Sequence, residues 1–213
     1  MAIGFRHQCL MYEGPPSEQL PALGAVISRK LKENYRCLYM HAKPIVDEMQ
    51  SHLSAKGLDV AYETDKTNLV FLSEQRHFGS DGRFNIERML CSVEGALNEA
   101  LNDGYQGLWV TGDMAWEIGP ERDFSGLLEY EWRIEELFRA RPEISAICQY
   151  HSSTLPRAIL RQSLLCHSTI FLSETGSLAN PYFLHPAFLA RESSEIPELE
   201  GALNRLIQQN KIN

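Results

Sequence analysis

Short apolar segments alternate with longer amphipathic segments along most of the 213-residue chain. Gln8–Tyr12, Arg36–Met40, Gly107–Val110 and Ile144–Tyr150 have the near-continuous apolar character of buried strands. Between them, apolar residues recur at helical spacing, most regularly over Ile86–Leu101. Strands and helices in alternation form βαβ units with right-handed crossovers. The sequence therefore predicts an α/β fold, a three-layer sandwich with helices on both faces of a mostly parallel central sheet.

The same criteria predict further elements and a division of the chain. Leu58–Tyr62 and Leu69–Leu72 are expected to be short strands, and Thr169–Leu172 the last strand. Near the C-terminus, four apolar residues recur at helical spacing: Leu199, Leu203, Leu206 and Ile207. We therefore expect one domain over residues 1–190 and a helical tail over residues 191–213, which docks on a partner or mediates a homodimer.

The composition argues against several classes of partner. The formal net charge is −8, and no cluster of Lys and Arg is present, so we expect no direct binding of nucleic acid. No apolar run approaches the roughly 18 residues that span a bilayer, and no signal peptide is recognisable, so no membrane association is expected. The five cysteines are widely spaced and form no CxxC pair, which is typical of free thiols in a reducing cytoplasm.

The loop after the first strand lacks the residues of a nucleotide-binding site. The phosphate loop of P-loop enzymes reads GxxxxGK[ST], and this string is absent from the chain. The loop over residues 13–19 reads EGPPSEQ instead. Proline has no N–H to donate, and the carboxylates repel phosphate. The sequence therefore predicts that the chain does not hydrolyse nucleotides.

In open α/β sheets, ligands bind beyond the carboxyl ends of the strands. The polar and aromatic residues at these ends are the candidate ligand-binding residues: Tyr12, His41, Asp113, Trp116, Gln149, Tyr150 and His151. His7 and Cys9 lie at the start of the first strand and so near the opposite edge. Trp109 is expected in the core.

Catalytic and metal-binding patterns are weak. The soft donors match no zinc motif by spacing: His7, Cys9, His41, Cys148 and His151. No GxSxG elbow and no recognisable Cys–His–Asn pattern occurs. Glu135 and Glu136 lie on a helix and are expected to face solvent. We therefore predict no bound metal, no cofactor and no enzymatic activity.

Seven segments nevertheless carry a resemblance, and they occur in order over about residues 5 to 188. They are HQCLMYE at 7–13, RCLYM at 36–40, DGRFN at 81–85, GLWVTGDMAW at 107–116, EYE at 129–131, CQYHSSTLP at 148–156 and NPYFLHP at 180–186. With these segments the chain resembles the MEDS family, the sensory domain named after methanogens, methylotrophs and the regulator DcmR.

The resemblance implies a RecA/KaiC-like fold without the P-loop and a role in sensing small organic compounds. Matching the motifs residue by residue implies these site residues: His7, Cys9, Tyr12, Asp113, Trp116, Gln149 and Tyr150. Asp113 falls where a Walker B acid would lie, although the family's usual Gly-Glu-Met turn here reads Gly-Asp-Met. His41 and His151 are candidates from their position at the strand ends alone.

The leading hypothesis is a non-catalytic domain that senses a small organic ligand and passes a conformational signal to a partner. That partner would be a kinase, an anti-sigma factor or a transcription regulator. One alternative is a degenerate ATPase fold that serves as a protein-interaction module without ligand. The other is a metal- or thiol-dependent enzyme that uses His41, Cys148 or His151.

Overall fold

Seven strands form one sheet in a computed structural model of the chain, which describes residues 6–73, 84–115, 126–184 and 197–210. The sheet order is β3-β2-β4-β5-β1-β6-β7, and every pair is parallel except the antiparallel pair β6–β7. The strands are β1 (His7–Tyr12), β2 (Tyr35–Met40), β3 (Leu69–Leu72), β4 (Gly107–Asp113), β5 (Ile144–His151), β6 (Thr169–Ser173) and β7 (Gly176–Ala179).

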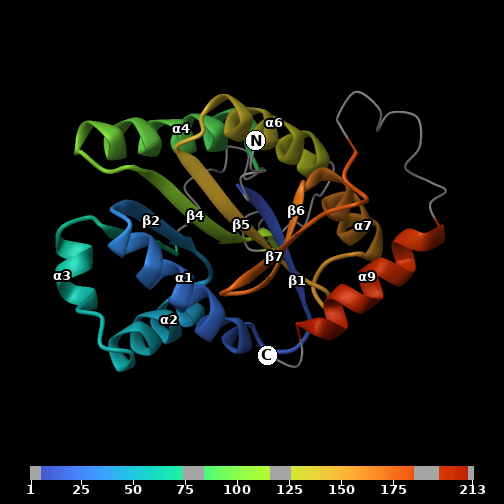
Figure 1. Cartoon of the computed structure of the whole chain (residues 1–213), viewed down its shortest axis with the longest axis horizontal. Coiled ribbons are helices and arrows are strands. Elements are labelled where there is room, and N and C mark those ends of the chain that lie inside the picture. The colour runs from blue at the N-terminus through green and yellow to red at the C-terminus, as the bar shows by residue number, and fades with distance from the viewer. Residues whose placement is uncertain (1–5, 74–83, 116–125, 185–196, 211–213) are drawn as a thin grey trace.

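Helices cover both faces of this sheet (Figure 1). They are α1 (Leu20–Lys32), α2 (Lys43–Ala55), α3 (Val60–Asp65), α4 (Ile86–Asn102), α6 (Leu127–Ala140), α7 (Arg157–Cys166) and α9 (Pro197–Gln209), with a short 3-10 helix, η1 (Pro16–Gln19), after β1. Helices α1 and α2 lie on one side and α4 and α6 on the other, which confirms the predicted α/β sandwich. None of these described helices is both long and apolar enough to cross a bilayer.

Each face of the sheet has its own hydrophobic core. On the side of α1 and α2, the core is built around Trp109, Tyr12 and Tyr39, all of which are buried. Trp109 is therefore a core residue, as predicted. On the other side, side chains of β1, β4 and β5 pack against α4, α6, α7 and α9, and this cluster is the larger of the two.

Two short elements differ from the prediction. The segment Leu58–Tyr62 was expected to be a strand, but α3 begins at Val60, and the Asp59 side chain caps it by accepting a hydrogen bond from the Tyr62 N–H. An N-terminal cap of this kind stabilises the first turn of a helix. It therefore favours helix over strand in a short apolar run that has no clear periodicity. The sheet also extends past β6, because the chain turns at Glu174 and Thr175 and returns as β7.

The C-terminal helix packs on the rest of the chain. Its apolar side chains are buried in the core beside α7 and β1: Leu199, Ala202, Leu203, Leu206 and Ile207. At its end, Asn210 Nδ2 donates a hydrogen bond of 2.7 Å to the carbonyl oxygen of Met11. The predicted apolar stripe is present, but the chain itself covers it, so this stripe is not available to a partner.

Candidate functional site

The pleat of the sheet separates the candidate residues into two groups. Successive side chains of a strand point to opposite faces, so residues two apart share a face. The first group, which we call the carboxyl-edge group, lies on the α1/α2 face: Tyr12, His41, Asp113, Gln149 and His151. His7, Cys9 and Tyr150 lie on the opposite face with α6 and α7. Trp116 lies outside the described residues. The structure thus does not bring the predicted residues into one site.

His41 presents a hydrogen-bond donor at the end of β2. Its Nδ1 atom accepts a hydrogen bond of 2.8 Å from the backbone N–H of Ala42, which assigns the proton of the neutral ring to Nε2. Burial lowers the pKa of His41, with Asp113 acting in the opposite direction, so the ring is neutral near pH 7. His41 Nε2 lies 3.8 Å from Asp113 Oδ2, which is too long for a hydrogen bond. This buried N–H has no hydrogen-bond partner among the described residues.

Tyr12 presents a second donor at the end of β1. The side chain is fully buried, and its hydroxyl group has no hydrogen-bond partner within the described parts of the chain. Burial and then the charge of Asp113 raise the pKa of Tyr12, so the hydroxyl keeps its proton. Burial and then the charge of Asp113 also raise the pKa of Tyr39. A buried polar atom without a partner is costly, and two beside one carboxyl group indicate a polar ligand.

Gln149 and His151 hold the site together. Gln149 Nε2 donates to Thr111 Oγ1 at 3.0 Å, which ties β5 to β4. His151 Nε2 donates to the carbonyl oxygen of Gly14 at 2.6 Å, and its ring meets the ring of Tyr12 at a centroid distance of 5.0 Å. Both side chains therefore position the loop and the strands around Tyr12.

The loop after β1 offers few backbone N–H groups to a phosphate. Gly14 adopts a φ of 95°, and Pro15 and Pro16 offer no N–H. The backbone N–H of Glu18 is already used, since it donates to the carbonyl oxygen of Pro15. The Glu18 carboxylate lies so close to Gly14 that a Cβ atom there would come within 2.8 Å of Oε2. Acidic and N–H-poor, this loop is unsuited to a polyphosphate.

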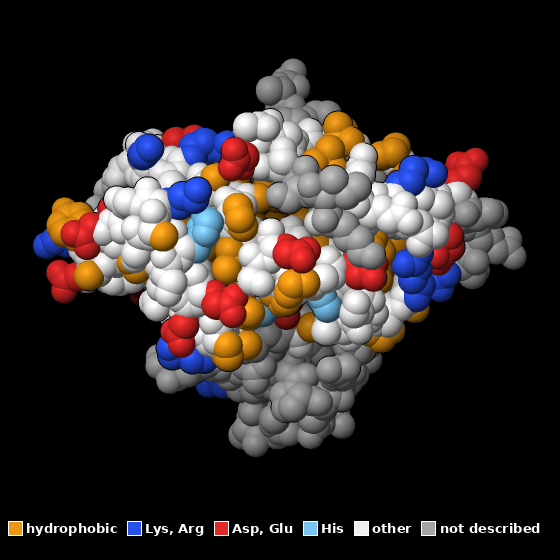
Figure 2. Space-filling model, turned by 90° about the horizontal axis from the view of Figure 1, so that it is seen from below, with side chains coloured by type: hydrophobic (Ala, Val, Ile, Leu, Met, Phe, Trp, Pro, Cys, Tyr) orange, Lys and Arg blue, Asp and Glu red, His pale blue; other side chains and the backbone are white. Residues whose placement is uncertain are grey.

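Figure 2 shows how charged side chains are distributed on the surface seen from below the view of Figure 1. Acidic, hydrophobic and histidine side chains are interspersed over the middle of this view, and Lys and Arg lie mostly toward its periphery. An anionic ligand would gain little from a surface of this charge distribution.

On the other face, six polar residues converge inside the larger core. We call them the buried polar cluster: His7, Glu131, Glu135, Cys148, Tyr150 and His167. His7 Nδ1 donates to Glu135 Oε2 at 2.9 Å, and His7 Nε2 lies 3.4 Å from both Glu131 Oε2 and Cys148 Sγ. The Tyr150 hydroxyl donates to Glu131 Oε1. His167 Nδ1 donates to the carbonyl oxygen of Ser163 at 2.7 Å, while its Nε2 lies 3.5 Å from Glu131 Oε2.

The charges of this cluster are strongly coupled. Burial alone would lower the pKa of His7, but Glu131 and Glu135 raise it to about 9. Burial and the neighbouring His7 lower the pKa of His167 to about 3. Burial would raise the pKa of Glu131, yet His167, His7 and the Tyr150 hydroxyl lower it, so the carboxylate is ionised. The cluster thus combines nitrogen, oxygen and sulfur atoms that could bind a metal ion, and all of them belong to buried side chains.

Three members of the cluster were not predicted as site residues from the sequence: Glu131, Glu135 and His167. Glu135 was expected to face solvent, but it is buried against His7, and only Glu136 is exposed. Glu131 and Glu135 share the inner stripe of α6 with Ile134 and Phe138. His167 lies two residues before Thr169, where β6 begins to pair with β1, and the sequence does not reveal this pairing. Cys9 is buried nearby but is not one of the four residues whose donor atoms lie together.

Comparison with known proteins identifies the family. The family model described as the methanogen/methylotroph, DcmR sensory domain matches residues 6–168. The chain belongs to the MEDS family. MEDS is a sensory-type domain, which agrees with a role in signalling. No curated protein matches this MEDS domain.

Two solved structures share its fold at low sequence identity. The uncharacterized protein PH0321 from Pyrococcus horikoshii, solved with an unknown peptide, has a TM-score of 0.51 and 14% identity and covers 81% of both chains. The flagellar accessory protein FlaH from Methanocaldococcus jannaschii has a TM-score of 0.50 and 13% identity. The match covers 87% of this chain and 83% of the FlaH chain. The MEDS domain therefore has a RecA-like fold, as the resemblance implied.

Proposed function

We propose that this MEDS domain is a non-catalytic sensor that binds a small uncharged organic compound at the carboxyl-edge group and signals to a partner protein. The observation that carries the proposal is the pair of buried donors, Tyr12 Oη and His41 Nε2, which have no hydrogen-bond partner in the described chain. The family match supports the sensory role in general terms.

The donors and the carboxyl group limit the chemistry of the ligand. Tyr12 and His41 each offer a neutral donor, and Asp113 offers an acceptor. A hydroxyl or carbonyl oxygen can accept from the donors, and a hydroxyl can also donate to Asp113. An anion would be repelled by Asp113 and by the acidic loop after β1. We therefore expect a short alcohol or ketone rather than a phosphate or a carboxylate.

The site is built from strands that do not all pair with one another. Tyr12 ends β1 and His41 follows β2, while β4 and β5 lie between these two strands in the sheet. A ligand that contacts both residues bridges the two halves of the sheet. Such a ligand shifts the protein toward the state it binds better, and a partner that recognises this state receives the signal. We propose a kinase, an anti-sigma factor or a transcription regulator as that partner.

Replacing the donors should weaken ligand binding without unfolding the domain. The probes are a series of short alcohols and ketones, with inorganic phosphate as the anionic comparison. A ligand at one hundred times its Kd stabilises by about 2.7 kcal/mol, which raises the Tm of a domain of this size by roughly 5–10 °C. Tyr12→Phe and His41→Phe should each weaken binding about 2–10-fold, because each removes one net hydrogen bond.

Two exposed or half-exposed residues of the same types serve as controls. Tyr62 is 54% exposed on α3, and His52 lies on α2 away from the carboxyl edge, so Tyr62→Phe and His52→Phe should leave ligand binding unchanged. If no alcohol or ketone raises the Tm, or if phosphate does so instead, the proposed ligand class is wrong. A stable complex with a signalling protein and no ligand response would favour the interaction module.

A further inference from the structure

The buried polar cluster contains two acceptor atoms that face each other with no proton between them. His167 donates through Nδ1 to a carbonyl oxygen, which can only accept, so in this tautomer of the neutral ring Nε2 carries a lone pair. Glu131 Oε2 also carries lone pairs and lies 3.5 Å away. Both residues are buried, with exposures of 0% and 1%, and neither atom has a hydrogen-bond partner among the described residues. A cation between them would remove this repulsion.

Three distances between the ligand atoms around this point match the spacing of a tetrahedral metal site. His7 Nε2 lies 3.4 Å from Glu131 Oε2 and 3.4 Å from Cys148 Sγ. The donor atoms of all four residues lie within 4.8 Å of one another. With metal–ligand bonds of about 2.0–2.3 Å, neighbouring donors in a tetrahedral zinc site are roughly 3.3–3.6 Å apart. The three distances given above, 3.4, 3.4 and 3.5 Å, fall in this interval.

We propose that the cluster is a four-coordinate site for a divalent transition-metal ion of the zinc type, with the ligands His7, Glu131, Cys148 and His167. Imidazole and thiolate ligands suit zinc and its neighbours, whereas magnesium and calcium prefer sites made only of oxygen. This site lies on the face of the sheet opposite the carboxyl-edge group, so the proposal is independent of the sensing function.

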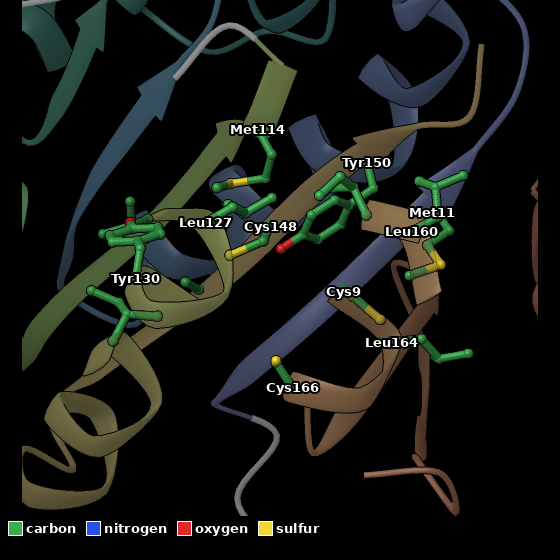
Figure 3. Packing of buried hydrophobic residues seen from close by; sticks show 14 of the residues in the cluster. Cys9, Met11, Met114, Leu127, Tyr130, Cys148, Tyr150, Leu160, Leu164 and Cys166 are labelled. Carbon is green, nitrogen blue, oxygen red and sulfur yellow. The ribbon is translucent and has the colours of Figure 1, made fainter. Parts of the chain in front are cut away.

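Each imidazole and carboxylate ligand is oriented through its other polar atom. His7 donates from Nδ1 to Glu135, and His167 donates from Nδ1 to the Ser163 carbonyl oxygen. Glu131 accepts from the Tyr150 hydroxyl with Oε1, whereas its Oε2 is the oxygen near His167 Nε2. Figure 3 shows Cys148 and Tyr150 near each other on β5, with the Tyr150 hydroxyl group on the side of Cys148. Such partners fix the tautomer and the direction of metal ligands and are characteristic of metal sites.

The surroundings indicate a closed, structural site. All four ligands are buried, and a cavity of about 20 Å³ next to Cys148 leaves room for about one water molecule. The ligands come from β1, α6, β5 and the segment before β6. A metal ion here would fasten α6 to three segments of the sheet layer, and its binding energy would add to the stability of the fold.

Cobalt(II) substitution tests the proposal on the full chain. We expect the metal-free protein to take up one equivalent of Co²⁺, with the visible bands of tetrahedral cobalt and a near-ultraviolet thiolate-to-cobalt charge-transfer band. Zinc should displace the cobalt and raise the Tm by roughly 10 °C when it exceeds its Kd a thousandfold. A folded wild-type chain that binds less than one equivalent, or binds without the charge-transfer band, would overturn the proposal.

Matched cysteine variants locate the site. Cys148→Ser should abolish the charge-transfer band, whereas Cys9→Ser and Cys166→Ser should retain it, because both cysteines are buried in the same core but lie outside the ligand set. Glu135→Gln should retain the band and weaken metal binding about 10–100-fold, as expected for a residue that orients His7. This variant keeps the proposal testable if Cys148→Ser does not fold. A band that survives in Cys148→Ser, or is lost in Cys166→Ser, would contradict the assignment.

Discussion

Deletion of residues 197–213 will leave a chain that no longer unfolds cooperatively. The deletion removes α9, whose Leu199, Leu203, Leu206 and Ile207 are buried in the larger core. Burying a side chain of this size contributes about 1.5–3 kcal/mol, and a whole domain is stable by only about 5–15 kcal/mol. The carbonyl oxygen of Met11 on β1 would also lose the hydrogen bond that Asn210 donates to it. Thermal melts followed by far- and near-ultraviolet circular dichroism measure the loss.

Single substitutions separate packing from the presence of the helix. Leu203 is fully buried, and Leu203→Ala should destabilise by about 2–5 kcal/mol. Gln208 is exposed on the same helix, so Gln208→Ala should stay within about 0.5 kcal/mol of the wild type. If the truncated chain melts cooperatively within a few degrees of the full chain, α9 is not needed for the stability of the domain, and this account of α9 is wrong.

Replacing Gly107 by alanine should destabilise the domain by about 3 kcal/mol or more. A Cβ atom at this position would lie 1.9 Å from the backbone oxygen of Glu143 and 2.9 Å from Tyr35 Cε1. The Glu143 oxygen already accepts the Leu108 N–H at the start of the β4–β5 ladder. Because the obstacle is backbone, the clash can be relieved only by moving β4 away from β5, and overpacking of this kind costs several kcal/mol.

Gly95 provides the matched control for this substitution. It lies within α4, and a Cβ atom there would meet nothing within 4 Å. Gly95→Ala should therefore stabilise by about 0.5–1 kcal/mol, since glycine lowers the stability of a helix interior. Chemical denaturation of both variants measures the difference. Equal stability of Gly107→Ala and the wild type would show that β4 and β5 do not approach as closely as described.

Most of the fold could be predicted because periodicity and packing agree along the chain. The helix predicted over Ile86–Leu101 is α4, and Asn85 caps it by accepting the Arg88 N–H. The failures are short elements without a periodic signal. The segment Leu58–Tyr62 has too few residues to distinguish a strand from a helix, and β7 has the weakly apolar sequence GSLA. Such a segment becomes a strand because it pairs with a neighbour, here β6, and its own residues do not predict this.

The candidate sites could be predicted only in part, because a site depends on which strands are neighbours. The alternation along β1 already separates His7 and Cys9 from Tyr12. The spacing of Glu131 and Glu135 from Leu127 already places them on the buried stripe of α6. The position of His167 beside His7 requires the pairing of β6 with β1, which no local pattern encodes.

The central claim is that the carboxyl edge of this MEDS domain accepts a small uncharged compound where a RecA-like fold would otherwise hold a nucleotide. Calorimetric titration of the full chain with ATP and magnesium tests it most directly. The predicted result is no measurable heat of binding, because the loop after β1 has prolines and Glu18 in place of phosphate-binding groups. Tight, magnesium-dependent binding of ATP with release of phosphate would contradict the account.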